Sequence, residues 1–497
     1  MRGRWRDAYN TNGGCKLGSR TRPRRLGHAK WALLLCVASL CSVHASDLPD
    51  EIQRVLSALD IPAENVSILI EDIDSGDQLL SHLPSVPRNP ASVMKLVTTW
   101  SALEALGPAY IWPTEVYFLG SFDGETLDGD LALKGYGDPF LVQEELWKLL
   151  RALRRTGLST INGNLVLDDS YFDVREAPPG EFDNQPERTY NVVPNALLMN
   201  FKAVQFQFRP DPRGRGVNVV SEPPLANLEI DNRIALVDGP CGGYQRGISF
   251  NLPDALEAAR VALGGTFSRN CRVYSLSRTA LQHDTYAFGL FSALWQEVGG
   301  HIRGQLRDAE VPEDAEPAIV WSSRPLAEIV RSINKNSNNV MTRQLLYTLG
   351  AESFGAPATR ENGIAAIMAL LRSRQLDVTS LNIANGAGLS RDSRISAELL
   401  VSMLGAAMNS PYAAEFVASL SIGGLDGTTR GRFDSRSGRG RTHLKTGRVD
   451  HVSALSGYVH AADGRDFALA VFVNSEDAHR GLGQEVEGAV LGWLLAQ

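Results

Sequence analysis

A long stretch of short β-like segments, residues 113–313, separates two parts of the chain with a different pattern. Before it, apolar alternation predicts a β-hairpin at 65–82, and helical spacing predicts a helix at 92–106. After it, helical spacing returns at 325–349, 362–375 and 396–408, and strand-like runs follow at 452–459 and 467–473. If the first and last strands share a sheet, the two ends form one α/β domain that the middle of the chain interrupts.

The expected domain organisation follows from this pattern. About 450 residues remain after the N-terminal leader described below, which is more than one hydrophobic core usually serves. We predict a discontinuous α/β domain formed by 46–112 and 314–497. We also predict an inserted domain formed by 113–186 and 276–313, and a second, β-rich insert at 187–275.

The first 45 residues have the composition of a secretory signal. They contain nine Lys or Arg residues and one acid, and an apolar run at 31–43 is followed by the small-residue site Val43-His44-Ala45. The run is shorter than the roughly 18 to 20 residues that span a bilayer. We expect cleavage after Ala45, a periplasmic location and no transmembrane anchor; an uncleaved membrane anchor is the alternative.

Charge and cysteines narrow the possible functions. The whole chain carries a formal net charge of −7, and removing the basic leader makes it more acidic, which argues against nucleic acid as a partner. Only Cys241 and Cys271 follow the leader, so either one disulfide or two buried thiols is expected. No His-x-x-x-His or Cys-x-x-Cys pattern occurs, so no metal is expected.

Three short motifs occur in order, and together they point to nucleophilic chemistry. They are Ser92-Val-Met-Lys95, Ser337-Asn-Asn339 and Lys445-Thr-Gly447. A second Ser-x-x-Lys match exists at Ser332 and Lys335, but it lies inside an expected helix, whereas Ser92 opens one behind Pro90.

The Ser92 motif suits a serine nucleophile at a helix start. Residues three apart lie on one helix face, which brings the Lys95 amine within reach of the Ser92 hydroxyl. The helix N-terminus favours an oxyanion. Lys95 can act as base only if burial or a neighbouring cation lowers its pKa, and Lys445 is the candidate cation. The alternative is that Ser92 only caps the helix and Lys95 is solvated.

These motifs carry a family resemblance, which extends over nearly the whole chain after the leader. The Ser-x-x-Lys, Ser-x-Asn and Lys-Thr-Gly set resembles that of penicillin-binding proteins. The long gap between the first two motifs is similar to the class C low-molecular-mass branch, the D-alanyl-D-alanine carboxypeptidase and endopeptidase family (serine peptidase family S13). Further similar stretches are 90–96, 135–139, 165–172, 190–195, 385–390 and 424–432.

The resemblance implies a fold, an activity and partners. The fold would be an α/β penicillin-binding or β-lactamase-like transpeptidase domain, an antiparallel sheet flanked by helices, with β-rich domains inserted between the first two motifs. The activity would be that of a serine-type D-Ala-D-Ala carboxypeptidase, a D,D-endopeptidase, or both, without a cofactor. The partners would be peptidoglycan peptides and β-lactam antibiotics.

The resemblance also assigns roles to individual residues. Ser92 would be acylated, with Lys95 as base and Ser337 relaying a proton to the leaving amine. Asn339 would hold the substrate amide, Lys445 and Thr446 its terminal carboxylate, and Gly447 would let the substrate approach the strand. The backbone N–H groups of Ser92 and Arg448 would form the oxyanion hole.

Two residues depart from the family pattern. Asn338 stands where Asp is usual, so a negative charge is missing, and Arg448 stands where Ser or Thr is common. They leave open a weakened enzyme that acts as a wall-binding scaffold. A serine β-lactamase is the other alternative, although the long insert argues against it.

Overall fold

The structure is a computed structural model, and it describes residues 48–175, 178–242, 247–251, 259–433 and 438–497. The expected signal peptide, residues 1–45, and its cleavage site lie outside this range. Within the described residues, no helix combines the length and apolarity needed to cross a membrane.

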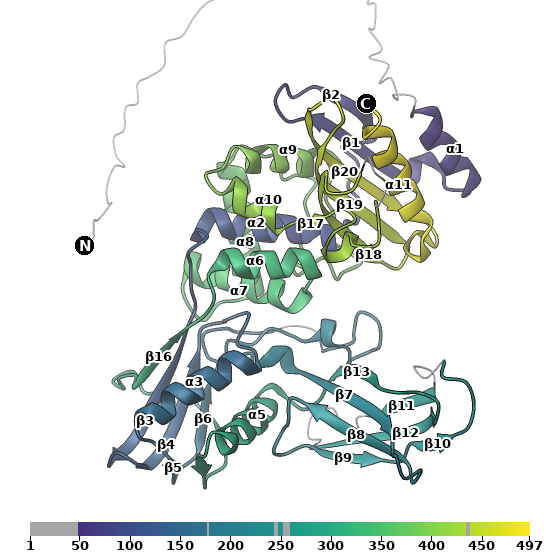
Figure 1. Ribbon diagram of the computed structural model, residues 1–497. Helices are drawn as coiled ribbons and strands as arrows, with labels where there is room; N and C mark the ends of the chain where they lie inside the picture. The colour runs from purple at the N-terminus through teal and green to yellow at the C-terminus, as the bar shows by residue number, and fades with distance from the viewer. Residues whose placement is uncertain (1–47, 176–177, 243–246, 252–258, 434–437) are drawn as a thin grey trace, which may run out of the picture. The chain divides into compact units, whose positions relative to one another are not determined.

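A six-stranded antiparallel sheet joins the two ends of the chain (Figure 1). Its strand order is β17-β18-β19-β20-β1-β2. β1 pairs with β20, so the first and last strands share a sheet, as the sequence predicted. The strands are β1 (Val66–Asp72), β2 (Gln78–His82), β17 (Ser421–Ile422), β18 (Thr442–Val449), β19 (Val452–His460) and β20 (Asp466–Asn474).

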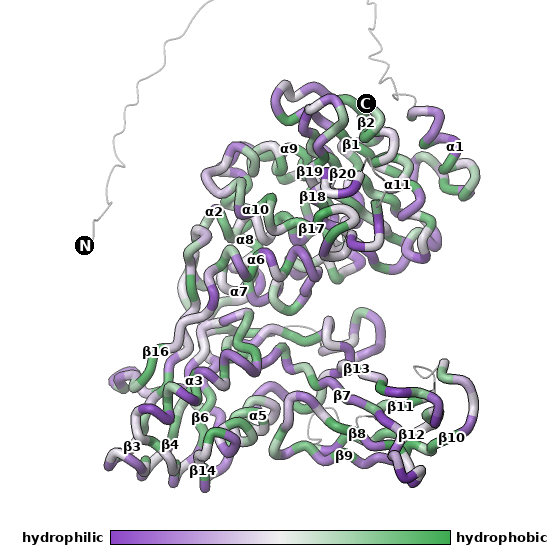
Figure 2. Tube along the Cα trace, in the orientation of Figure 1, coloured by the Kyte–Doolittle hydropathy of each residue, from purple (hydrophilic) through white to green (hydrophobic). Residues whose placement is uncertain are grey.

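Helices cover both faces of this sheet, which explains why its central strands β19, β20 and β1 are buried almost throughout. Along β20, Leu469 and Val471 pack against α1 (Asp50–Ala58) and α11 (Leu482–Leu494), whereas Ala470 packs on the opposite face. Figure 2 accordingly shows β19 and β20 as largely hydrophobic. The opposite face carries α2 (Lys95–Leu106), α6 (Leu326–Asn336), α7 (Asn339–Phe354), α8 (Arg360–Ser373), α9 (Ala397–Met408) and α10 (Ala413–Ser419).

The inserted region contains a second, seven-stranded sheet. Its main path is β14-β5-β4-β3-β16, with β6 between β4 and β15, and helices α3 (Gln143–Arg155) and α5 (His283–Glu297) contribute to its core. β16 pairs with β3, so this sheet extends past the expected domain boundary at 313. The strands are β3 (Pro113–Phe122), β4 (Thr126–Gly135), β5 (Thr160–Ile161), β6 (Leu165–Asp168), β14 (His301–Ile302), β15 (Leu306–Asp308) and β16 (Ile319–Ser322).

The expected second insert consists of two small sheets. One has the order β13-β7-β8 and the other β10-β12-β11, with β9 paired to β12. Phe206 and Phe208 of β7 belong to the same buried cluster as Leu149 of α3 and Leu290 of α5, so the two inserts share one core. The strands are β7 (Ala203–Pro210), β8 (Val217–Glu222), β9 (Glu229–Asn232), β10 (Ala235–Val237), β11 (Ile248–Asn251), β12 (Arg260–Ser268) and β13 (Tyr274–Thr279).

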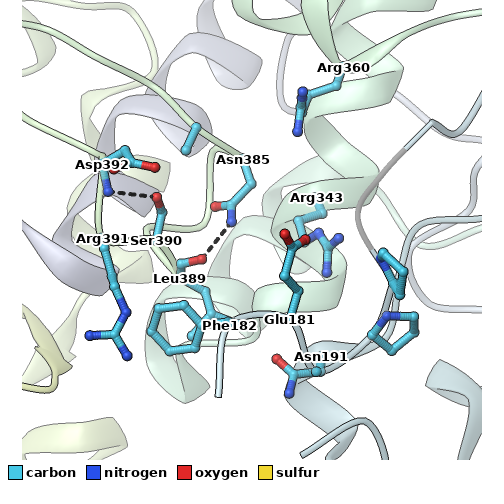
Figure 3. Close-up of a pocket in the computed structure, with 14 residues that line it drawn as sticks. Glu181, Phe182, Asn191, Arg343, Arg360, Asn385, Leu389, Ser390, Arg391 and Asp392 are labelled. Carbon is cyan, nitrogen blue, oxygen red and sulfur yellow. Dashed lines mark hydrogen bonds between the residues drawn. The ribbon is translucent and has the colours of Figure 1, made fainter. Parts of the chain in front are cut away.

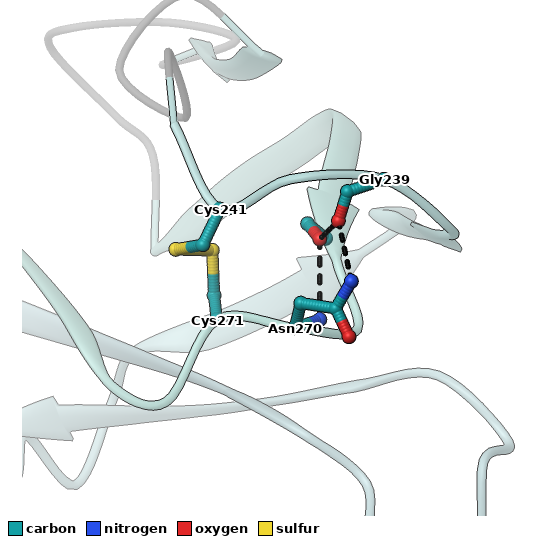
Figure 4. The surroundings of a disulfide bond; sticks show 5 residues. Gly239, Cys241, Asn270 and Cys271 are labelled. Carbon is teal, nitrogen blue, oxygen red and sulfur yellow. Dashed lines mark hydrogen bonds between the residues drawn. A yellow bond between two sulfur atoms is a disulfide. The ribbon is translucent and has the colours of Figure 1, made fainter.

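A disulfide links Cys241 and Cys271 in this region, with an S–S distance of 2.09 Å (Figure 4). Next to it, the carbonyl oxygen of Gly239 accepts hydrogen bonds from the side chains of Ser268 and Asn270. Of the two states left open by the sequence, the structure shows the disulfide.

Short 3-10 helices connect several of these elements. They are η1 (Ala63–Asn65), η2 (Ala91–Met94), η3 (Thr189–Asn191), η4 (Asn200–Lys202), η5 (Gly427–Thr429) and η6 (Ala478–Arg480).

Candidate active site

The three motifs meet at one edge of the six-stranded sheet. Ser92 lies in η2 and Lys95 begins α2. The second motif forms the junction between α6 and α7, and the third lies on β18. The expected helical segment 325–349 is therefore two helices, because Ser337 adopts a left-handed conformation with φ 55° that ends α6.

Lys95 is a buried amine beside the Ser92 hydroxyl. Its side chain is 0% exposed, and its Nζ lies 3.0 Å from Ser92 Oγ. Nζ also donates to Asn339 Oδ1 at 2.6 Å and to the carbonyl oxygen of Ala387 at 2.6 Å. A neutral amine has two hydrogens for these two acceptors, so its lone pair remains available to the Ser92 hydroxyl.

Burial, and secondly the nearby Lys445, holds the pKa of Lys95 well below its usual value. All the partners of Lys95 above are uncharged, and within the described residues no carboxylate pairs with it. The site therefore favours the neutral amine, the form that can accept a proton.

The second Ser-x-x-Lys match has different surroundings. Lys335 forms an ion pair with Asp426 at 2.7 Å, and the structure shows no hydrogen bond between Lys335 and the Ser332 hydroxyl. The Lys335 amine is therefore directed to a carboxylate and not to a serine hydroxyl. The two Ser-x-x-Lys matches therefore differ in the partner of the lysine amine.

Lys445 is also fully buried. Its Nζ donates to Ser337 Oγ at 2.9 Å and to the Thr446 carbonyl oxygen at 2.7 Å. Burial lowers the pKa of Lys445 to about 7. Ser337 and Lys445 therefore form a hydrogen-bonded pair through which a proton can pass near neutral pH.

Asn338 has a structural role that does not require a charge. Its Oδ1 accepts a hydrogen bond from the Met341 backbone N–H at 3.0 Å and caps α7. Asn and Asp are about equally effective N-caps, so the departure from the family pattern preserves the helix start.

Gly447 lies where β18 passes close to Ser92. A Cβ at this position would lie 2.5 Å from the Pro90 carbonyl oxygen and 3.1 Å from the Ser92 backbone nitrogen. β17 pairs only with His443 and Leu444 of β18, so from Lys445 onward this edge of β18 carries no strand partner among the described residues. An extended peptide can add to such an edge.

Two cavities flank Ser92. The first, of about 580 Å³, is also lined by Ser337, Asn339 and Arg448, and the second, of about 370 Å³, by Ser337, Thr446 and Arg448. The other residues of these cavities lie outside the three motifs, most of them far from the motifs in the sequence. They include Phe182, Asp183, Tyr190, Arg391 and Asp450 in the first, and Thr428, Arg432 and Gln484 in the second.

A third cavity, of about 420 Å³, borders the first and shares Phe182, Leu389 and Arg391 with it (Figure 3). Asn385 donates to the Leu389 carbonyl oxygen at 2.8 Å and shapes the loop 385–390. This loop also supplies the Ala387 carbonyl oxygen that holds Lys95. Its resemblance to the family segment was visible in the sequence, but its contact with Lys95 was not.

One group of possible metal ligands occurs among the described residues. The ligand atoms of His451, Asp477 and His479 lie within 4.8 Å of one another. However, His479 Nδ1 accepts the His451 backbone N–H at 2.9 Å, and His451 Nδ1 accepts that of Asp477 at 3.3 Å. In a neutral imidazole whose Nδ1 accepts, Nε2 carries the proton, so neither ring offers a lone pair to a metal in this arrangement. The absence of a metal stays an expectation.

Curated relatives cover most of the chain. A D-alanyl-D-alanine carboxypeptidase from an Actinomadura species is 27% identical over 452 residues, which cover 88% of this chain and 83% of the relative. The D-alanyl-D-alanine carboxypeptidase DacB of Haemophilus influenzae is 22% identical over 452 residues, covering 90% and 92%.

Solved structures show the same fold. The crystal structure of penicillin binding protein 4 from Haemophilus influenzae matches with a TM-score of 0.76 at 22% identity, covering 89% of this chain and 99% of that one. A predatory peptidoglycan endopeptidase from Bdellovibrio bacteriovorus matches with a TM-score of 0.52 at 16% identity, covering 87% and 92%. These likenesses confirm the predicted penicillin-binding α/β fold.

The family profile matches residues 48–494, which is nearly all of the described chain. With its three motifs assembled around Ser92, the chain belongs to the D-Ala-D-Ala carboxypeptidase 3 (S13) family.

Proposed function

We propose that this chain is an exported serine D-alanyl-D-alanine carboxypeptidase and D,D-endopeptidase that cleaves peptidoglycan stem peptides through an acyl-enzyme on Ser92. The observation that carries this proposal is the buried Lys95 amine, 3.0 Å from Ser92 Oγ and held by uncharged acceptors. The names of the relatives and the family support the same reaction.

In the first half-reaction, neutral Lys95 takes the proton of the Ser92 hydroxyl while Oγ attacks the carbonyl carbon of the penultimate D-Ala. The backbone N–H groups of Ser92 and Arg448 stabilise the oxyanion. The C–N bond then breaks as the leaving amine receives, through Ser337, the proton that Lys95 took from Ser92, which leaves Lys95 neutral again; Lys445 contacts Ser337 at 2.9 Å.

In the second half-reaction, a water molecule attacks the ester carbonyl and gives a proton to the base. The C–O bond to Ser92 breaks, Ser92 Oγ recovers a proton, and the shortened peptide leaves as a free acid. Asn339, whose Nδ2 faces the cleft near the Tyr190 carbonyl oxygen, is placed to hold the substrate amide.

The terminal carboxylate of the substrate binds Lys445 and Thr446 in this proposal. Thr446 Oγ1 lies 2.8 Å from Thr428 Oγ1, in the cavity on the leaving-group side of Ser92. The unpaired edge of β18 accepts the extended peptide backbone. β-Lactams, which present a reactive carbonyl to the same serine, are expected to acylate Ser92 and inhibit the enzyme.

A secreted enzyme must reach its cell-wall substrate, and the basic and apolar leader supports export to the periplasm. The disulfide in the insert is consistent with an oxidising compartment.

Mass spectrometry of purified muropeptides, before and after incubation with the protein lacking residues 1–45, tests the proposed function. We expect pentapeptides to lose one alanine and cross-linked dimers to become monomers, and Ser92→Ala to do neither. Unchanged muropeptides together with no labelling by a fluorescent penicillin would contradict the hydrolase and favour a scaffold. Rapid turnover of the penicillin would indicate a β-lactamase.

A further inference from the structure

The two cavities beside Ser92 differ in charge. The first contains Arg391 and Arg448 together with Asp183 and Asp450, so its charges balance. The second contains Arg432 and Arg448, and no carboxylate residue lines it. Its other lining groups are hydroxyls, an amide and a glycine. The leaving-group side of the nucleophile is therefore lined by two arginines and no carboxylate; Arg432 is paired with the buried Glu487, which does not line the cavity, and Arg448 is the arginine without such a partner.

Arg448 has no partner of its own within the described residues. Its side chain is exposed, and it takes part in neither an ion pair nor a side-chain hydrogen bond there. Because Arg448 and Thr446 are two residues apart on β18, their side chains share one face of the strand. That face also carries the Thr446 contact to Thr428 of η5, which borders the second cavity.

A buried carboxylate, that of Glu487, fixes the side chain of Arg432. Its guanidinium donates to Glu487 Oε2 at 2.6 Å, and Ser453 donates to the other oxygen of Glu487 at 2.6 Å. Glu487 is 0% exposed, whereas Arg432 reaches the cavity. A guanidinium fixed by a buried carboxylate can still present its remaining N–H groups to a ligand.

We propose that the second cavity is an anion-selecting subsite in which Arg448, assisted by Arg432, binds a side-chain carboxylate of the leaving residue. This inference rests on the proposed function. It specifies the leaving residue as one that carries a second carboxylate, in its side chain. The volume of about 370 Å³ lies in the range of small-ligand pockets and exceeds what a methyl side chain fills.

The pH behaviour of the neighbouring cations supports this assignment. Burial lowers the pKa of Lys445 to about 7, so its charge is lost as the pH rises above neutrality. A guanidinium stays charged throughout this range. Above neutral pH, Arg448 therefore remains positively charged after Lys445 has lost its charge.

The test uses two isosteric peptides, ending in D-Ala-D-Asp and D-Ala-D-Asn, as competitors of Ser92 labelling by a fluorescent penicillin at pH 8. Competition reports binding without requiring turnover. We expect the D-Asp peptide to compete roughly fivefold better than the D-Asn peptide in the wild type, the scale of a solvent-exposed charge pair. Arg448→Thr should bring the ratio near one, and Arg448→Lys should restore part of it.

Arg430→Thr is the matched control, because Arg430 is an exposed arginine near η5 that does not line the cavity. It should keep the wild-type ratio. A wild-type ratio of one, or a ratio unchanged in Arg448→Thr, would overturn the subsite.

If Arg448→Thr does not fold, Arg448→Gln and added salt in the wild type replace it, and each should lower the ratio. The subsite would also be overturned if neither Arg448→Gln nor added salt lowered the ratio. Wild-type protein that penicillin does not label would contradict the proposed function itself, which distinguishes the two failures.

Discussion

Two segments of this protein share the pattern Ser-x-x-Lys but differ in what surrounds the lysine. At Ser92, the amine of Lys95 is fully buried and contacts three uncharged oxygen atoms. At Ser332, the amine of Lys335 contacts the carboxylate of Asp426 at 2.7 Å. Burial without a counter-charge lowers the pKa of Lys95, whereas a carboxylate occupies the amine of Lys335.

The difference shows that the motif alone does not make a nucleophile. Helical spacing brings a lysine near a serine in either segment, but only desolvation without a counter-charge prepares the lysine as a base. Three supporting groups come from outside the Ser92 motif: Asn339, Ala387 and Lys445.

Replacing the two lysines should separate the segments most strongly. Lys95→Met should slow acylation of Ser92 by a β-lactam roughly 10²- to 10⁴-fold, the usual contribution of a general base. Lys335→Met should leave the acylation rate within the same order of magnitude, because Lys335 contacts neither Ser92 nor its base. Stopped-flow acylation kinetics measure both. Equal losses of acylation rate in the two variants would show that Lys95 and Lys335 do not differ in this role.

The second lysine of the site, Lys445, should act through the substrate carboxylate. Thr446→Val should slow carboxypeptidase turnover roughly tenfold to a hundredfold, because a charge-assisted hydrogen bond is worth about 1.5 to 3 kcal/mol. Amidating the substrate terminus should cost the wild type a similar factor and the variant little. Lys445→Ala should be worse, since it also removes a cation that lowers the pKa of Lys95.

Wild-type protein that hydrolyses amidated and free-acid peptides equally well would show that Lys445 and Thr446 do not bind the carboxylate. Lys445 would then act only electrostatically, beside Lys95.

The pH dependence should reveal the titration of Lys445. With its pKa lowered to about 7, Lys445 is charged below this pH and loses its charge above it. The preference for free-acid over amidated substrate, measured as a ratio of kcat/KM values, should therefore fall as the pH rises from 6 to 9. A ratio constant over this range would contradict the assignment.

The helix cap between the two segments should have the smallest effect. Asn338→Ala removes the cap of α7 and should lower the free energy of unfolding by about 1 kcal/mol, whereas Asn338→Asp should change it little. Chemical denaturation measures both. A large stabilisation by Asn338→Asp would mean that the missing charge matters for folding.

Much of the fold was predictable because its signals are local. Period-two alternation identified the hairpin and the late strands, and the change of pattern at 113–313 identified the insert. The domain boundaries were less accurate, since the pairing of β16 with β3 and the core shared by the two inserts depend on contacts remote in sequence.

The candidate site likewise combines residues that the sequence identified with contacts that it could not reveal. Ser92, Lys95, Ser337, Asn339 and Lys445 were identifiable from short motifs, and the structure brings them together. The Ala387 carbonyl oxygen could not be identified from the sequence, because every residue has a backbone carbonyl group. Arg432 was visible only as part of a similar stretch, and its fixation by Glu487 depends on the packing of α11.

The most direct test of the account is to locate the β-lactam adduct by peptide mapping and mass spectrometry. The account predicts one covalent adduct, on the peptide that contains Ser92, and none in Ser92→Ala, while Ser332→Ala is labelled like the wild type. An adduct on the peptide that contains Ser332, or one that persists in Ser92→Ala, would contradict it.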